Sequence, residues 1–311
     1  MAEQIPHQFS RAKDQIGHRD EVSLPLPSVT ALVMLLLLIL LCSLIGSALV
    51  FGLGQIQNLD YGSIFYGLAE NNNLQHRNFI RSVLMINHCS MFILPGLLFG
   101  LFLYRQRWRY FFHLQQAPPF QLILITMVWI IVAFPLVQLS FWLNQQIPLP
   151  DWAQTMEDSS GGLIKAILVA EAPFELLFNL IIIALLPSIG EELIFRGILQ
   201  QHLAKVSKSM GAGIWLSAFL FSTMHLQFEG FLPRMLLGVL LGYLFYWTAN
   251  LWLPIIAHFF YNGSQVLGQY WSASSLPDLD LEQANQVSWP LSLFSIIFVL
   301  AIGYYLFHYA P

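Results

Sequence analysis

Apolar residues are gathered into long runs along this chain, and short polar segments separate each run from the next. A helix that crosses a membrane needs about 20 mostly apolar residues. Eight runs fit this description, which predicts an all-α polytopic membrane protein with eight transmembrane helices. The expected spans are residues 29–51, 79–104, 122–143, 174–198, 210–226, 235–249, 252–268 and 290–308.

The composition agrees with this pattern and excludes several classes of protein. Hydrophobic residues make up 57% of the chain and charged residues only 10%, whereas a soluble domain carries about 25% charged residues. The net charge is −4 with 13 Lys and Arg, so no basic surface for a nucleic-acid partner is expected. Both cysteines, Cys42 and Cys89, lie in apolar runs, which favours packing roles over a disulfide framework.

Positive charge predicts the orientation in the membrane, because cytoplasmic loops carry an excess of Lys and Arg. With eight spans, the N-terminal tail and the loops after the second and fourth spans fall on one side. These segments carry Arg11, Lys13, Arg19, Arg105, Arg107, Arg109, Lys205 and Lys208. Both termini are therefore expected in the cytoplasm. The first run is expected to be an uncleaved anchor, because it is longer than the roughly 7–15 residues of a signal-peptide core.

The runs divide the chain into five parts. Residues 1–28 form a cytoplasmic tail, and residues 29–143 hold three transmembrane helices. An outer loop follows at 144–173, in which the apolar run 163–170 predicts a short helix. Residues 174–268 carry most of the polar side chains inside spans, and residues 269–311 provide an outer loop and the last span.

Ionisable side chains inside spans suggest a functional site, because each costs about 2.5–3.5 kcal/mol on insertion scales. They gather in the fourth, fifth and seventh spans, with one amide beside them. The residues are Glu191, Glu192, Arg196, His225, His258 and Asn262. The sequence thus points to one polar cluster between three helices.

The spacing gives this cluster a geometry. Glu192 and Arg196 are four residues apart, so they can form an ion pair within one helix, while Glu191 lies about 100° around the helix. The turn between the fourth and fifth spans centres near Lys208, with Glu191 and His225 17 residues to either side. A carboxylate and an imidazole are therefore expected at similar depth in an antiparallel hairpin.

These residue types are suited to amide hydrolysis. A carboxylate in an apolar site suits a general base near neutral pH, and a neighbouring histidine can share its water. A second histidine and an amide, His258 and Asn262, can donate hydrogen bonds to an oxyanion. Water activated by Glu191 would then attack a carbonyl group polarised by His258 and Asn262.

The residues alone leave other interpretations open. The Glu192–Arg196 pair can be purely structural, and the histidines and asparagine can simply join helices through hydrogen bonds. The cluster can also serve as a proton or ion pathway. Glu191, His225 and His258 could form a metal site with an open position for water, although the chain has no H-E-x-x-H signature.

Three motifs in this order resemble the CPBP family of intramembrane proteases, which includes CAAX proteases and bacteriocin-processing enzymes. Residues 191–196 read E-E-x-x-x-R, residues 221–225 read F-x-x-x-H, and residues 258–262 read H-x-x-x-N. The similarity covers about residues 174–268, which would then be the catalytic core. Each motif alone is weak, and their combination is specific.

The resemblance implies a role for each motif residue. Glu191 and His225 would hold the attacking water, and His258 and Asn262 would stabilise the oxyanion. The residues implied to support the site are Glu192, Arg196 and Phe221. No cofactor is favoured, because Asn262 suits an oxyanion donor better than a metal ligand; the alternative is one divalent metal such as zinc.

The resemblance also implies a setting for this chemistry. The substrate would be a protein or peptide segment at the membrane, either prenylated or not, and membrane lipid would be the other partner. The compact spacing from His225 to His258 resembles bacterial members, which suggests the bacterial cytoplasmic membrane. The alternative to an enzyme is a non-catalytic scaffold or an immunity or regulatory protein with the same fold.

Two further groups of polar residues lie near span ends. Arg81, Asn87 and His88, near the start of the second span, are expected mainly to pair with a neighbouring helix or with headgroups. Glu171 and Glu175 lie at the outer edge of the fourth span and are expected to face water.

Overall fold

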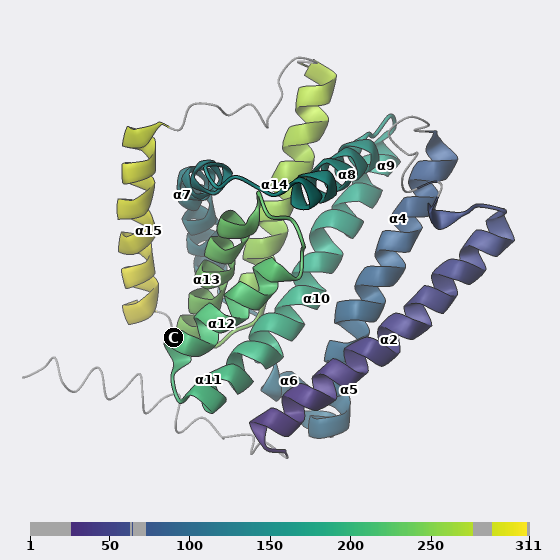
Figure 1. Ribbon diagram of the computed structural model, residues 1–311. Coiled ribbons are helices and arrows are strands. Elements are labelled where there is room, and N and C mark those ends of the chain that lie inside the picture. Colours follow the sequence, from purple (N-terminus) through teal and green to yellow (C-terminus); the bar gives the residue numbers. More distant parts are fainter. Residues whose placement is uncertain (1–25, 63, 65–72, 276–287, 310–311) are drawn as a thin grey trace, which may run out of the picture.

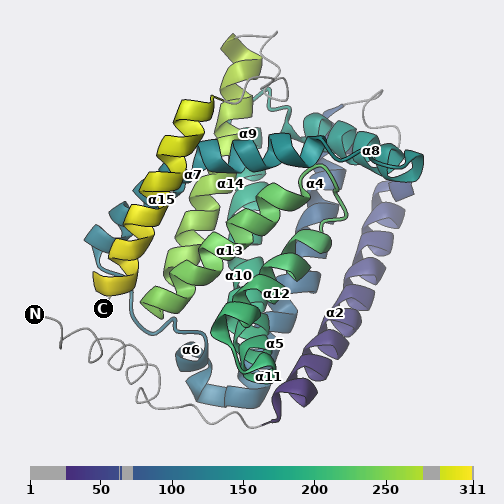
Figure 2. The same cartoon turned by 60° about the vertical axis from the view of Figure 1, so that its left-hand side comes forward.

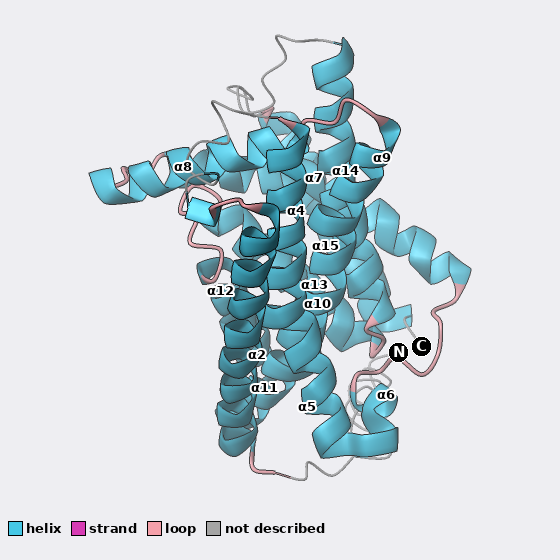
Figure 3. Cartoon of the chain, turned by 90° about the vertical axis from the view of Figure 1, so that its right-hand side faces the viewer, coloured by secondary structure: helices cyan, strands magenta, loops and turns pink. Residues whose placement is uncertain are grey.

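The computed structural model describes residues 26–62, 64, 73–275 and 288–309. Within these residues the regular secondary structure is entirely helical (Figure 3). The helices are α2 (Ser28–Gln57), α4 (Leu74–His88), α5 (Leu94–Tyr104), α6 (Trp108–Phe111), α7 (Phe120–Gln145), α8 (Asp151–Leu168), α9 (Pro173–Asn179), α10 (Leu186–Ile194), α11 (Gln201–Ser207), α12 (Met210–Thr223), α13 (Phe231–Thr248), α14 (Trp252–Ser275) and α15 (Trp289–Tyr309). The all-α prediction is confirmed.

The predicted multi-span architecture is also confirmed, although not the count of eight. Among the described residues, six helical stretches are long and apolar enough to cross a membrane. They are Ser28–Gln57, Leu74–Phe111, Phe120–Gln145, Pro173–Ser207, Phe231–Thr248 and Trp289–His308. Helix α12 has only 14 residues, or about 21 Å of length, and α14 is less apolar than these six. Spans at α12 and α14 remain a prediction.

Three π-helical turns interrupt the long helical stretches. Turn η1 (Cys89–Ile93) joins α4 to α5, η3 (Leu180–Leu185) joins α9 to α10, and η4 (Phe195–Gln200) joins α10 to α11. A proline stands at the start of the α-helix that follows η1 and η3. Because proline cannot donate the usual helical hydrogen bond, it favours such local widening.

The rod formed by α9, α10 and α11 runs through the middle of the molecule (Figure 1). Helices α2, α4 and α5 lie on one side of it, and α7, α12, α13, α14 and α15 lie on the other. The start of α2, helix α6 and the α11–α12 turn lie at one end of the bundle (Figure 2). The ion-pair and hydrogen-bonding residues of α10 are therefore enclosed from both sides.

Gly190 allows a close contact between α10 and the π-helical turn η1. A Cβ atom at this position would lie 2.8 Å from Cβ of Phe92 and 2.9 Å from Cγ1 of Ile93. These distances are too short for carbon atoms, so only glycine lets α10 approach η1 this closely. The contact brings the end of α4 next to the first residues of the E-E-x-x-x-R motif.

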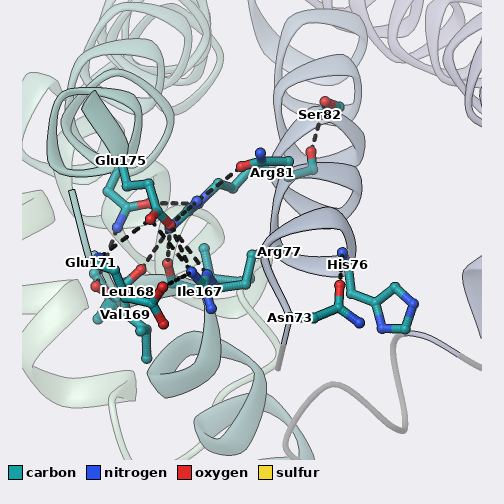
Figure 4. Close-up of polar contacts among 12 residues, drawn as sticks. Asn73, His76, Arg77, Arg81, Ser82, Ile167, Leu168, Val169, Glu171 and Glu175 are labelled. Atoms are coloured by element: carbon teal, nitrogen blue, oxygen red, sulfur yellow. Dashed lines mark hydrogen bonds and ion pairs between the residues drawn. The ribbon is translucent and has the colours of Figure 1, made fainter. Parts of the chain in front are cut away.

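A buried polar network ties α4 to α9 near the opposite end of the bundle from α6 (Figure 4). Arg81 lies 2.8 Å from the Glu175 carboxylate and donates to Asn179. It also donates to the carbonyl oxygens of Ile167 and Val169, at the end of α8. The expectation that Glu175 faces water is wrong, because its carboxylate is buried against two arginines, whereas Glu171 is exposed as expected.

Helix α8 lies crosswise over that same end of the bundle (Figures 1 and 3). It is longer than the short helix expected from residues 163–170 and begins at Asp151. The Glu157 carboxylate accepts a hydrogen bond of 3.0 Å from the backbone N–H of Glu229, and Trp152 packs edge-on against Phe228. Helix α8 is thereby tied to the loop that follows the F-x-x-x-H motif.

Candidate functional site

The candidate site contains a buried ion-pair network. Arg196 Nη1 lies 2.6 Å from Glu192 Oε1, which confirms the ion pair expected from their spacing. The same oxygen lies 2.8 Å from Nδ1 of His258 on α14. Arg196 also donates to the carbonyl oxygen of Gly238 on α13. One carboxylate thus joins α10, η4 and α14, and all three side chains are buried.

Glu191 lies beside this network, and a histidine faces each of its two oxygens. His258 Nε2 is 3.8 Å from Glu191 Oε2, and His88 Nε2 is 3.6 Å from Oε1. Glu191 is only 5% exposed. Both distances are longer than a direct hydrogen bond. A small movement of the side chains or a bridging water would join each imidazole to the carboxylate. The carboxylate is therefore enclosed by α10, α4 and α14.

His225 is not brought against Glu191. Its ring donates from Nδ1 to the carbonyl oxygen of Phe221 one turn earlier, at 2.8 Å, and its side chain is exposed. No ion pair joins it to Glu191 in the part of the chain that the structure describes. Helix α12 ends at Thr223, two residues before His225, so the two side chains form no direct ion pair, and a water shared between them stays a prediction.

The ring of Phe221 contacts three of the predicted site residues. Its ring centre lies 5.0 Å from that of His225 and 6.0 Å from that of His258. The guanidinium carbon of Arg196 lies 5.0 Å from the same ring, close enough for a cation–π contact. The Phe221 ring therefore packs against side chains of all three motifs, which agrees with a supporting position for Phe221.

Asn262 lies one turn after His258 on α14 and is half-buried. Its Nδ2 donates to the carbonyl oxygen of Ile183 at 3.3 Å. Ile183 belongs to the π-helical turn η3, where the backbone hydrogen bonding is altered. An asparagine amide carries two N–H donors, so one remains for a ligand.

The alternative metal site is not preformed. No group of three or more His, Cys, Asp or Glu side chains is arranged to hold a metal ion in residues 26–62, 64, 73–275 and 288–309. Of the three suggested ligands, Glu191 and His258 lie together, while His225 lies apart from Glu191. The choice between a metal-free site and one divalent metal therefore stays a prediction.

Comparisons with known proteins agree with this location. Residues 173–264 match the family model of the type II CAAX prenyl endopeptidase Rce1-like proteins. On this similarity the segment is called the Rce1-like domain. It contains Glu191, His225, His258 and Asn262, but it leaves out His88. The six long apolar helices support an integral membrane protein, in which residues 173–264 are similar to the Rce1-like proteins.

One curated relative extends the comparison. The chain is 32% identical over 85 residues to the uncharacterized protein YpbD of Bacillus subtilis (strain 168). The match covers 26% of this chain and 40% of the relative's length. No solved structure matches the chain.

Proposed function

We propose that this protein is an intramembrane endopeptidase that hydrolyses a peptide bond in a membrane-associated or prenylated substrate. The observation that carries the proposal is the setting of Glu191. This buried carboxylate has an imidazole Nε2 atom near each of its oxygens, and it lies within the Rce1-like domain. A general base for water needs such an enclosed position next to hydrogen-bonding side chains.

The reaction starts with a water molecule next to Glu191. The carboxylate accepts a proton from this water while the water oxygen forms a bond to the carbonyl carbon of the peptide. His225 holds the same water through Nε2, because its Nδ1 is bonded to the Phe221 carbonyl. His258 and Asn262 donate hydrogen bonds to the resulting oxyanion. The carbon–nitrogen bond then breaks, and Glu191 returns its proton to the departing amine.

The supporting residues keep this arrangement in place. Glu192 fixes His258 through Nδ1, Arg196 balances the charge of Glu192, and Phe221 packs against His225 and His258. We assign no resident cofactor to the site, and one divalent metal such as zinc is the competing assignment. The substrate is a peptide that lies in or at membrane lipid, and no nucleic acid takes part.

The proposed setting is the bacterial cytoplasmic membrane with both termini in the cytoplasm. The start of α2, helix α6 and the α11–α12 turn lie at the same end of the bundle. Lys and Arg gather in the sequence segments at this end, and such segments remain in the cytoplasm. Residues 174–268 act as the catalytic core.

Cleavage of quenched peptides by the detergent-purified full chain tests the proposal. Peptides with and without a prenylated cysteine are compared for the wild type, Glu191→Gln and the control Glu171→Gln, whose carboxylate is exposed outside the site. We expect cleavage to be lost in Glu191→Gln and retained in the control and with chelator. Loss with chelator would favour the metal alternative, and cleavage by Glu191→Gln would contradict the mechanism. Absence of cleavage in every folded sample would favour a scaffold or immunity protein.

A further inference from the structure

We propose that His88 is a positioning residue of the hydrolytic site: its Nε2–H group holds the carboxylate of Glu191 in the orientation that receives the proton of water. This inference rests on the proposed function. His88 lies on α4, outside the Rce1-like domain, so neither the three motifs nor the family match includes it.

The first argument is the position of the imidazole. His88 Nε2 is 3.6 Å from Glu191 Oε1, which is closer than the 3.8 Å between His258 Nε2 and Oε2. The Nε2 atom of His88 is buried and has no hydrogen-bond partner. A buried polar nitrogen without a partner is costly, and the Glu191 carboxylate is the acceptor within reach.

The second argument is that the fold holds His88 in this place. His88 is the last residue of α4, and the π-helical turn η1 begins at the next residue. Such turns occur frequently at functional sites, because they change the direction of side chains within a helix. Phe92 in η1 lies 4.7 Å from the His88 ring, centre to centre, and restricts its movement.

The third argument connects the two helices. Gly190 directly precedes Glu191, and its missing side chain allows α10 to contact Phe92 and Ile93 of η1. The same close contact that brings α10 to η1 therefore brings Glu191 to His88.

The consequence concerns the orientation of the carboxylate. A carboxylate that is held at only one oxygen can rotate about its terminal bond. Because His88 faces Oε1 and His258 faces Oε2, the two imidazoles together define the plane of the Glu191 carboxylate. His88 thus acts on the reaction through Glu191, and its loss should lower the rate of the chemical step more than substrate binding.

Three substitutions at this position separate a hydrogen-bonding role from a packing role. In His88→Gln the amide nitrogen can replace Nε2, in His88→Asn it lies closer to the place of Nδ1, and in His88→Phe the ring has no donor. We expect kcat to fall about 100-fold in His88→Phe and His88→Asn, with KM changed less than about threefold, and to fall less than about tenfold in His88→Gln.

His202→Phe is the matched control. His202 is a buried histidine that, like His88, packs against phenylalanine rings, and its ring nitrogens have no hydrogen-bond partners. It lies on α11 outside the proposed site, so kcat should change less than about twofold. Equal rates for His88→Phe and the wild type, or a failure of His88→Gln to restore the rate, would overturn the proposal for His88.

A second measurement does not depend on activity. Nitrogen NMR of histidine-labelled protein in detergent, with the His88 signal assigned from His88→Gln, should show the Nε2 resonance of His88 shift in Glu191→Gln. An unchanged resonance would overturn the contact. Cleavage that survives in Glu191→Ala would refute the proposed function itself, whereas inactivity of Glu191→Ala with full activity of His88→Phe would refute only the role of His88.

Discussion

His258 Nδ1 lies 2.8 Å from Oε1 of Glu192, the same oxygen that Arg196 contacts at 2.6 Å. An ionised carboxylate only accepts hydrogen bonds, so Nδ1 of His258 carries a proton. Its other ring nitrogen, Nε2, faces Glu191. To donate to an oxyanion through Nε2, the ring must carry both protons. The proposed mechanism therefore uses His258 as an imidazolium, held between the carboxylates of Glu191 and Glu192.

Replacing Glu192 with glutamine tests this role of His258. In Glu192→Gln the side-chain oxygen can still accept from His258 and Arg196, but the negative charge that stabilises the imidazolium is lost. A hydrogen bond to a charged group contributes about 1.5–3 kcal/mol, which corresponds to about a 10- to 100-fold decrease in kcat. Steady-state kinetics on the cleaved peptide measure the decrease, and an unchanged kcat would contradict the role of His258 as an imidazolium.

Removing Arg196 alone should destabilise the protein. Arg196→Met leaves the buried Glu192 without its closest cation, and breaking a buried ion pair costs about 3–5 kcal/mol. The double variant Arg196→Met with Glu192→Leu removes both charges and should regain most of this stability. Thermal unfolding in detergent compares the two variants. A double variant that unfolds as early as the single one would show that the network stabilises by more than charge balance.

Asn262→Ala tests the oxyanion assignment. The Asn262 amide uses one N–H group for the Ile183 carbonyl, and the second is assigned to the oxyanion. Loss of one such donor lowers kcat by about 10²- to 10³-fold in well-studied hydrolases. We expect this decrease with little change in KM, because the oxyanion forms only during the reaction. A change confined to KM would instead assign Asn262 to substrate binding.

The helical fold and the Glu192–Arg196 ion pair could be predicted from the sequence for physical reasons. Apolar runs of membrane-spanning length predict helices directly, and a four-residue spacing fixes the Glu192–Arg196 pair within one helix. Similar depth along the hairpin did not bring Glu191 and His225 into a direct ion pair, because depth does not show where α12 ends or which way a side chain faces.

Sequence patterns could not predict contacts between helices that are far apart along the chain. His88 lies more than 100 residues from Glu191 in the chain, and no spacing rule relates α4 to α10. Glu175 was expected at the water surface because it stands near a span end, but Arg77 and Arg81 enclose it. A signal was nevertheless present for both: arginines and a histidine within one apolar stretch require partners, and buried carboxylates on another helix provide them.

The Arg81 network should hold the end of α8 in place. In Arg81→Leu, the carbonyl oxygens of Ile167 and Val169 lose their donor, and Glu175 loses its closest cation. We expect a decrease in stability of about 3–5 kcal/mol and faster proteolysis between α8 and α9. Limited proteolysis in detergent, followed by mass analysis of the fragments, locates the cut. Unaltered cleavage at this junction would mean that α8 is held by its other contacts.

Gly190→Ala tests whether close packing between α10 and η1 assembles the site. The added methyl group would lie under 3 Å from Phe92 and Ile93, and overpacking of this kind costs about 1–3 kcal/mol. We expect lower thermal stability together with a fall in kcat, because the displaced helix moves Glu191 away from His88. Gly161→Ala is the matched control, since a Cβ atom there meets nothing within 4 Å and alanine is the better helix former. If Gly190→Ala unfolds at the same temperature as the wild type and keeps its kcat, the close approach of α10 to η1 does not determine the geometry around Glu191.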